Sequence, residues 1–251
     1  MDNLDDVTRL PDEFDGRVRL FPLPDLVVFP HAMQPLHIFE PRYCDLLAES
    51  LASDQLIAMA TMTGGLPDLK SSDAAIAPTV CICRVISHAE VENDRHNVLL
   101  VGIRRATIVQ EIDAGRTFRI AEVDAQEDIY SPSKAKYRLA LKGKLLTAFS
   151  NIIPATATVQ KNLHELMAGQ MGLGPITDII SYTLPFDVQS KLQLLTESDV
   201  DLRADHLIRL LQSGKIKLHS VSIEEQSLDS PSLEQDRSPS EDGFPPAFSL
   251  N

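Results

Sequence analysis

The sequence predicts an α+β protein, with a small β-barrel followed by a bundle of helices. From Val18 to about Asp124 the chain consists of short β-prone runs, broken by Pro, Gly, Asn and Asp. After about residue 131, apolar residues recur instead at helical spacing. The 251 residues are 43% hydrophobic and 24% charged, an ordinary globular composition that allows a sizeable core.

The predicted strands are short, and many of them alternate apolar with polar residues. A single helix interrupts them at about 42–51, where Tyr43, Leu46, Leu47 and Leu51 form an apolar stripe. Many short strands with one inserted helix are typical of a strongly bent sheet or open barrel. The expected strands are VRLFPL (18–23), LVVFP (26–30), PLHIF (35–39), QLIAMATM (55–62), PTVCICRVIS (78–87), NVLLVGI (97–103), ATIVQEI (106–112) and FRIAEVDA (118–125).

About four helices are predicted after residue 131. Ser131 is a candidate N-cap with Pro132 at the first helical position, and Asp187 is a candidate cap further along. Ser198 and Asp201 stand in capping-box spacing before a last helix that stops at Gly214. The expected apolar stripes are Tyr137, Leu141, Leu145 and Phe149; Val188, Leu192 and Leu195; and Ala204, Leu207, Ile208 and Leu211, with further helical segments at 159–169 and 175–184.

Charge and composition exclude several classes of protein. The formal net charge is −13, which disfavours binding to the phosphates of nucleic acid or to an acidic membrane surface. The start of the chain has no secretory signal pattern and no apolar run is long enough to cross a membrane, so we expect a cytoplasmic location. Residues 221–251 hold seven acidic residues and one arginine and predict a disordered tail.

No catalytic motif or metal site is evident. The phosphate-binding loop G-x-x-x-x-G-K-[ST], the G-x-S-x-G elbow, H-E-x-x-H and C-x-x-C are all missing, and the seven histidines are scattered. Cys44, Cys81 and Cys83 lack the spacing of a tetrahedral site, and we expect the last two to be small buried groups on one face of a strand. The sequence therefore predicts no enzyme, no cofactor and no metal.

The stretch PLHIFEPRY, residues 35–43, predicts a corner between a strand and a helix. Pro22, Pro24, Pro30, Pro35 and Pro41 lie where we expect strand ends or turns, because proline fixes φ and removes a hydrogen-bond donor. We expect Pro41 in the first turn of the helix, and Glu40 near its positive end, bonded to local amides or paired with Arg42. Ile38 and Phe39 are expected in or near the core.

The pattern from Leu20 to Leu51 resembles the start of the N-terminal domain of the ATP-dependent Lon protease family. The matching pairs and triplets are Pro22-Leu23, Val28-Phe29-Pro30, Pro35-Leu36, Ile38-Phe39-Glu40 and Arg42-Tyr43. VGIRRATI, residues 101–108, resembles a family strand that carries a glycine and an arginine, here Gly102 and Arg104, and 189–211 is similar to the helical end of that domain. The resemblance covers about 17–214, so we expect the ATPase and Ser–Lys peptidase domains of Lon to be absent.

The resemblance implies a PUA-like pseudo-barrel followed by a helical bundle. With it, the chain divides into a flexible 1–16, a barrel domain at 17–128, helices at 129–220 and the acidic tail at 221–251. In Lon this module engages protein substrates, so we expect a free-standing, non-catalytic polypeptide binder or adaptor, either monomeric or a weak dimer. Its partners would be unfolded or extended polypeptides, with a protease or chaperone as a further partner.

The candidate polypeptide-binding residues are Phe29, Phe39, Glu40, Arg42 and Tyr43. They would contribute to an apolar cleft between barrel and bundle, or to a strand edge that an extended segment joins. The alternative is an RNA-binding PUA-like module, for which Arg95, Arg104 and Arg105 supply local positive charge. The net charge and an aromatic content of 5% argue against that alternative.

Overall fold

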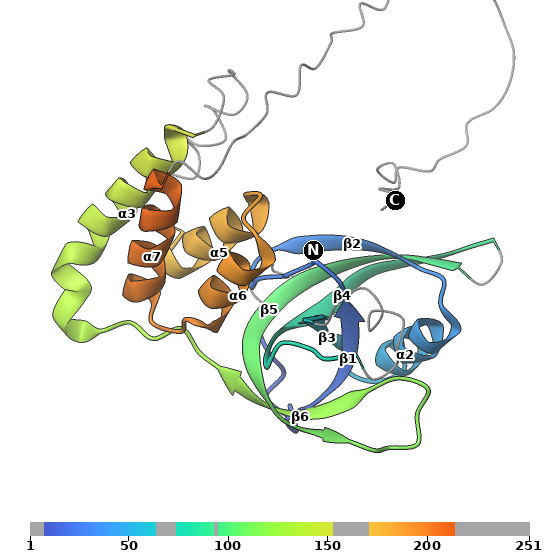
Figure 1. Ribbon diagram of the computed structural model, residues 1–251. Helices are drawn as coiled ribbons and strands as arrows, with labels where there is room; N and C mark the ends of the chain where they lie inside the picture. The colour runs from blue at the N-terminus through green and yellow to red at the C-terminus, as the bar shows by residue number, and fades with distance from the viewer. Residues whose placement is uncertain (1–7, 64–73, 93–94, 153–170, 214–251) are drawn as a thin grey trace, which may run out of the picture. The chain divides into compact units, whose positions relative to one another are not determined.

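The computed structural model describes residues 8–63, 74–92, 95–152 and 171–213, and in them it confirms the α+β prediction. Within these residues six strands form one sheet, one helix is inserted between its strands, and four α-helices and a short 3₁₀ turn follow it (Figure 1). The elements in chain order are β1 (Arg17–Leu23), β2 (Met33–Ile38), α2 (Pro41–Leu51), β3 (Leu56–Thr61), β4 (Thr79–Val91), β5 (Arg95–Ile112), β6 (Ile120–Gln126), η2 (Pro132–Lys134), α3 (Ala135–Ser150), α5 (Leu173–Thr183), α6 (Val188–Thr196) and α7 (Val200–Gln212).

The sheet closes on itself as a barrel. Its strand order is β2-β5-β4-β3-β1-β6, and β6 also pairs with β5, so that β6 bridges the two sides. All pairings are antiparallel except β1 with β3. The long, bent β5 runs along both the closed part and the extension that it forms with β2 and β4 (Figure 1). The predicted pseudo-barrel is therefore confirmed.

Two strand predictions were wrong. Residues 26–30 lie outside the strands, because Asp25 has a positive φ of 55° and Pro24 and Pro30 bound the segment. The runs at 97–103 and 106–112 form one strand, β5, whose register shifts between Ile108 and Gln110 in its pairing with β6. The charged pair Arg104–Arg105, which separates the two predicted runs, lies inside that strand.

Strand β3 is buried on both faces along its whole length. In β3 the side chains of Ile57 and Met59 join one apolar cluster, together with Leu46 and Leu47 of α2, while Leu56, Ala58 and Ala60 join the other. Cys81 and Cys83 are fully buried in the first of these clusters, as predicted. Residues 8–16, which we expected to be flexible, place Leu10 and Phe14 against the second cluster.

The helices form a separate core that includes part of the N-terminal segment. Each of these four helices contributes buried residues to this core, among them Leu145 and Phe149 of α3, Ile180 of α5, Leu195 of α6 and Leu207 of α7. Val27, Phe29 and Ala32, from the segment between β1 and β2, pack into the same core. Val28, which lies between Val27 and Phe29 in the chain, packs instead in the barrel cluster. The segment therefore links barrel and helices.

Two predictions about the helices were wrong in detail. Tyr137 is 60% exposed, so the buried stripe of α3 begins only at Leu141. Asp199 caps α7, because its carboxylate accepts from the amides of Asp201 and Leu202, while the Ser198 hydroxyl donates to Gln126. The Asp187 cap of α6 is confirmed by its bond from the Ser190 amide.

Some predictions lie outside the described residues, namely the helical segment at 159–169 and the acidic tail at 221–251. The domain boundaries at 16, 128 and 220 remain predictions. No helix in the described part of the chain has the length and apolar character needed to cross a membrane.

Candidate functional site

The corner predicted at 35–43 presents an exposed apolar stripe. In β2 the burial alternates, so that Met33, Pro35 and His37 face outward while Gln34, Leu36 and Ile38 face inward. Phe39 continues the outward series and is 62% exposed, and Met33 is 53% exposed. The expectation that Phe39 lies in the core was therefore wrong. We call Met33, Pro35, His37 and Phe39 the β2 stripe.

A chain of contacts behind Phe39 fixes the corner. Glu40 and Arg42 form an ion pair at 2.9 Å, and the Arg42 guanidinium lies 4.5 Å from the centre of the Tyr43 ring. Tyr43 in turn stacks on Phe21 at 4.1 Å and donates to the carbonyl of Pro22 at 3.0 Å. Phe39 is therefore exposed at the end of a supported segment, next to one charge of each sign.

The groups at this corner have identifiable electrostatic and capping roles. Burial raises the pKa of the Tyr43 hydroxyl, which keeps it a neutral donor. Glu40 occupies the N-cap position of α2, and its backbone carbonyl accepts from the amides of Tyr43 and Cys44, but its side chain caps nothing. The expected bond to local amides was therefore wrong, and the expected ion pair with Arg42 is present. Pro41 begins the helix as predicted.

The structure separates the five predicted binding residues into two groups. Phe39, Glu40 and Arg42 reach the surface together, at the end of β2 and the start of α2. Phe29 is fully buried in the helical core, and Tyr43 is buried in a barrel cluster. Of the five, only Phe39, Glu40 and Arg42 can touch a partner without local unfolding.

The outer edge of β2 is partly blocked. Because Pro35 has no amide hydrogen, its pairing with Leu99 directs the backbone groups of Met33, Pro35 and His37 away from β5. Tyr182 of α5 donates to the carbonyl of Met33, and the Gln34 side chain donates to that of Pro35. An added strand would find one donor missing and two acceptors occupied, so the side-chain face of β2 is the better contact surface.

A buried cluster of charges joins barrel and helices, and the sequence did not predict it. Arg105 of β5 contacts Asp178 of α5 at 2.7 Å and also pairs with Asp128. Arg203 of α7 contacts Asp128 at 2.9 Å and Asp178 at 3.3 Å. Arg105 further donates to the carbonyl of Leu195 in α6. Two arginines and two aspartates thus connect β5, the segment after β6 and three helices.

Burial and the neighbouring arginines have opposite effects on the carboxyl group of Asp178. Burial raises the pKa of Asp178 to about 6, although Arg203 and Arg105 oppose the shift. Its second oxygen, Oδ2, is buried and has no hydrogen-bond partner in the part of the chain that the structure describes. Arg104, the motif arginine of the sequence analysis, instead pairs with the exposed Glu127. A pair of arginines at 104–105 and a pair of acidic residues at 127–128 were the only sequence signal, and they did not show which side chain points inward.

Gly102, also part of the predicted motif, has a steric role. A Cβ atom at this position would lie 2.1 Å from the Phe29 carbonyl oxygen. The segment from Phe29 to Ala32 packs directly on β5 here, since the Gly102 amide donates to the Ala32 carbonyl and its own carbonyl accepts from His31. Pro30 lies within the same segment, between Phe29 and His31.

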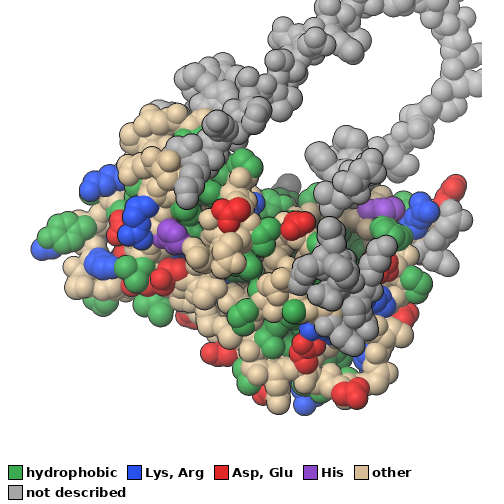
Figure 2. Space-filling model, viewed as in Figure 1, with side chains coloured by type: hydrophobic (Ala, Val, Ile, Leu, Met, Phe, Trp, Pro, Cys, Tyr) green, Lys and Arg blue, Asp and Glu red, His purple; other side chains and the backbone are tan. Residues whose placement is uncertain are grey.

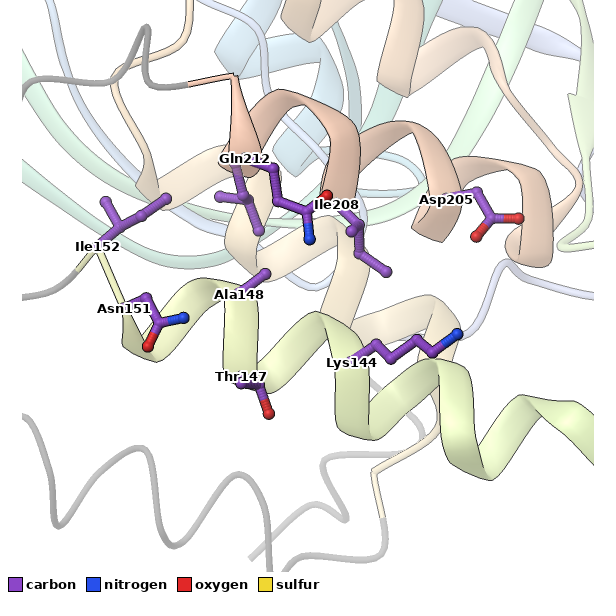
Figure 3. Close-up of a pocket in the computed structure, with 9 residues that line it drawn as sticks. Lys144, Thr147, Ala148, Asn151, Ile152, Asp205, Ile208 and Gln212 are labelled. Atoms are coloured by element: carbon purple, nitrogen blue, oxygen red, sulfur yellow. The ribbon is translucent and has the colours of Figure 1, made fainter.

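We expected a cleft between barrel and bundle, but the groove in the described residues lies elsewhere. A groove of about 780 Å³ lies between α3 and α7, and its walls come from these two helices (Figure 3). The described junction between barrel and helices holds instead the charge cluster and the buried Phe29. Lining the groove are Lys144, Thr147, Ala148, Asn151, Ile152, Asp205, Ile208, Leu211 and Gln212. Within the described residues, no three His, Cys, Asp or Glu side chains gather as a possible metal site.

Comparison with known proteins agrees with this architecture. The family model of the ATP-dependent protease La (LON) substrate-binding domain matches residues 17–213. The chain belongs to this family. The match begins at the first residue of β1 and ends one residue after α7, so barrel and helices together correspond to the Lon domain.

Individual relatives give the same result. The chain is 25% identical over 214 residues to a Lon protease of Koribacter versatilis, covering 82% of this chain and 26% of that protein. It is 23% identical to the Lon protease of Haemophilus influenzae, with 77% and 24% covered. The chain thus spans about a quarter of the length of the Lon proteases that it matches.

Two solved structures share the fold. A Lon N-terminal domain protein from Xanthomonas campestris aligns with a TM-score of 0.54 and 20% identity, covering 76% of this chain and 96% of that one. The N-terminal domain of a Mycobacterium avium complex Lon protease aligns with a TM-score of 0.60 and 16% identity, covering 79% and 99%. The chain therefore has the Lon N-terminal fold across nearly the whole of both neighbours.

Proposed function

We propose that this Lon-family chain binds extended or unfolded polypeptide segments, with the β2 stripe as its contact surface. The observation that carries the proposal is Phe39, a large aromatic residue exposed at a supported corner. Exposed aromatic anchors with a polar surround are typical of residues that dominate binding energy. The family description names a substrate-binding domain, which supports the same class of function.

The stripe matches an extended segment in spacing and chemistry. Its outward residues are two positions apart along β2, which is also the repeat of side chains on one face of an extended chain. Met33 and Phe39 offer apolar contacts near its two ends, and Met adapts to different side chains. Glu40 and Arg42 add one carboxylate and one guanidinium beside Phe39, so the stripe does not require a charged partner.

The alternative, binding of RNA, has less support. Of the three arginines that suggested it, Arg105 is buried in ion pairs and Arg104 pairs with Glu127, so that Arg95 alone is exposed. The net charge of −13 adds long-range repulsion of phosphates. We therefore propose a protein partner, such as an unfolded client, a protease or a chaperone.

No catalytic role is proposed, because the match covers the substrate-binding domain alone. Purified chain should hydrolyse ATP only at background rate. Turnover that follows the protein through successive purification steps would contradict this part of the proposal.

Binding can be tested with a fluorescein-labelled 15-residue peptide of Ser, Phe and Leu that carries no charged side chain. Fluorescence anisotropy should show saturable binding to the full chain. Replacing Phe39→Asp or Met33→Asp should weaken it about tenfold or more, because each change places a charge in an apolar contact. Both positions are exposed, so circular dichroism should show an unchanged fold.

The matched control is Val109→Asp, the same kind of change at a residue of β5 that is 63% exposed. It should leave peptide binding within about twofold of wild type. Equal losses at positions 39 and 109, or binding unaffected at all three, would remove the β2 stripe as the site.

A further inference from the structure

The outer face of α3 is a second surface without a partner in the described structure. In this 16-residue helix the exposed positions fall on one side: Lys136, Ala140, Gly143 and Thr147 along the middle, with Leu139 on one flank and Tyr137 and Lys144 on the other. Leu145, Ala148 and Phe149 occupy the opposite, buried side, and Leu146 is buried at its edge, next to the flank that carries Leu139. We call the exposed side the α3 face.

Large apolar side chains remain uncovered on this face. Leu139 is 81% exposed and Tyr137 is 60% exposed, although the helix has a full buried side of its own. A surface helix that only covers a core would carry polar residues at such positions. Apolar residues on the outward side indicate a contact surface.

The charge of this segment is opposite to that of the whole chain. Residues 131–150 carry five basic and no acidic residues, in a protein of net charge −13. Two of the five bases are used internally, since Arg138 pairs with Asp201 and Lys142 donates to the carbonyl of Met171. Lys134, Lys136 and Lys144 have no ion pair with a carboxylate among the described residues.

Figure 2 shows several Lys and Arg side chains at the left of the view, where α3 and α7 lie, with hydrophobic side chains and fewer acidic ones among them. Ala140, Gly143 and Thr147, along the middle of the face, have small side chains. A Cβ atom built on Gly143 would meet no atom of a neighbouring element within 4 Å. A second helix could therefore approach closely along Ala140, Gly143 and Thr147, with Leu139 and Tyr137 on its two sides.

We propose that the α3 face docks an acidic amphipathic helix of another polypeptide chain. Apolar residues of that helix contact Leu139 and Tyr137, and its carboxylates pair with Lys136 and Lys144. The positive charge of the face selects an acidic partner and disfavours a basic one. This surface is distinct from the β2 stripe and does not depend on it.

The test uses the full chain and a fluorescein-labelled 18-residue peptide with Leu at helical spacing and Glu elsewhere. Binding measured by anisotropy should be saturable, and it should weaken about tenfold or more in Leu139→Glu and in the double variant K136E/K144E. Raising NaCl from about 50 to 500 mM should also weaken it, because exposed charges are screened. A peptide with every Glu replaced by Lys should not bind.

Two controls separate the surfaces. Val109→Glu is the same chemical change on a barrel strand and should leave binding unchanged. Phe39→Asp should also leave it unchanged, while it weakens the uncharged peptide, so the two proposals can fail independently. Circular dichroism of Leu139→Glu should match wild type, because Leu139 makes few contacts with the core.

Several outcomes would overturn the proposal. The acidic peptide could fail to bind wild type, or bind wild type and Leu139→Glu equally. A single-stranded RNA oligonucleotide could bind more tightly than the peptide with the same dependence on Lys136 and Lys144, which would assign the face to nucleic acid. Sedimentation of the chain alone could show a dimer that Leu139→Glu dissociates, which would assign the face to a second copy.

Discussion

At the scale of single residues, Gly102 gives the sharpest prediction. Gly102→Ala should destabilise the protein by about 3 kcal/mol or more, because its Cβ would lie 2.1 Å from the Phe29 carbonyl oxygen and the backbone must shift. Urea unfolding followed by far-ultraviolet circular dichroism measures the loss.

Gly143 provides the matched control for this change. It lies inside α3 with open space around the added Cβ, so Gly143→Ala should stabilise by about 0.5–1 kcal/mol through helix propensity. If both substitutions changed the unfolding free energy by the same amount, that result would contradict the close packing of Phe29 on β5.

The buried carboxyl of Asp178 predicts a pH dependence. Its folded-state pKa of about 6 lies above the unfolded value of 3.8, so the protonated form favours folding. The stability that Asp178 contributes is complete below about pH 4 and is lost as the pH rises to about 6. The loss amounts to about 3 kcal/mol at most, from 1.36 kcal/mol for each pKa unit.

The test is to compare wild type with Asp178→Asn in urea unfolding between pH 4 and pH 7.5. The difference in unfolding free energy, wild type minus variant, should fall as the pH rises through this range, because only wild type has the titrating group. A difference that rises with pH would mean that the two arginines outweigh burial and depress the pKa.

The sequence predicted some of these residue roles and missed others. Phe39 was expected in or near the core and also as a candidate binding residue. The alternation of β2 shows that it is exposed, since it continues the outward series Met33, Pro35, His37, and its role in binding stays a prediction. Arg104 was singled out, yet its neighbour Arg105 is the buried one. Successive residues of a strand face opposite sides, so a shift of one position exchanges an exposed ion pair for a buried one.

At the scale of elements, the start of α7 depends on Asp199. Asp199→Ala should reduce stability by about 1 kcal/mol, because two amides of the first turn lose their acceptor. Asp205→Ala, the same change at an exposed position of α7, should have little effect. Chemical denaturation of both variants checks this, and an equal loss would contradict the capping role.

Most helices and strands were predicted from the sequence. Their exact ends were not, nor was the joining of two predicted strands into the single strand β5. Helix α2 begins at Pro41 and α6 at the Asp187 cap, as local chemistry dictates. The cap of α7 was misplaced by one residue, since Ser198 and Asp199 are both good caps and the tertiary bond of Ser198 to Gln126 decides between them. The exposure of Tyr137 was missed because residues four apart drift by about 40° around a helix, so Tyr137 lies on the flank of the side on which Leu145 and Phe149 are buried.

At the scale of the whole molecule, the charge cluster should hold the helices on the barrel. Arg105→Met should cost about 3–5 kcal/mol near neutral pH, because Asp178 and Asp128 then remain buried with one partner fewer. Arg104→Met, its neighbour paired with an exposed glutamate, should cost less than about 1 kcal/mol. Urea unfolding measures both, and similar losses would contradict the structural role of the cluster.

The overall architecture followed from composition, periodicity and the motif at 20–51, but the junction did not. The cluster combines Arg105, Asp128, Asp178 and Arg203, which are far apart in sequence and carry no local pattern. The predicted cleft between barrel and bundle was likewise a statement about packing between distant segments. The expected oligomeric state, monomer or weak dimer, stays a prediction that sedimentation can test.

The central claim is that a polypeptide binds across the β2 stripe, and photo-crosslinking tests it most directly. The photoreactive amino acid p-benzoylphenylalanine would replace Phe39 in one sample of the full chain and Val109 in another, each irradiated with the uncharged labelled peptide. We expect a crosslinked adduct from position 39, reduced by excess unlabelled peptide, and none from position 109. Adducts of equal yield from both positions, or from position 109 alone, would contradict the account.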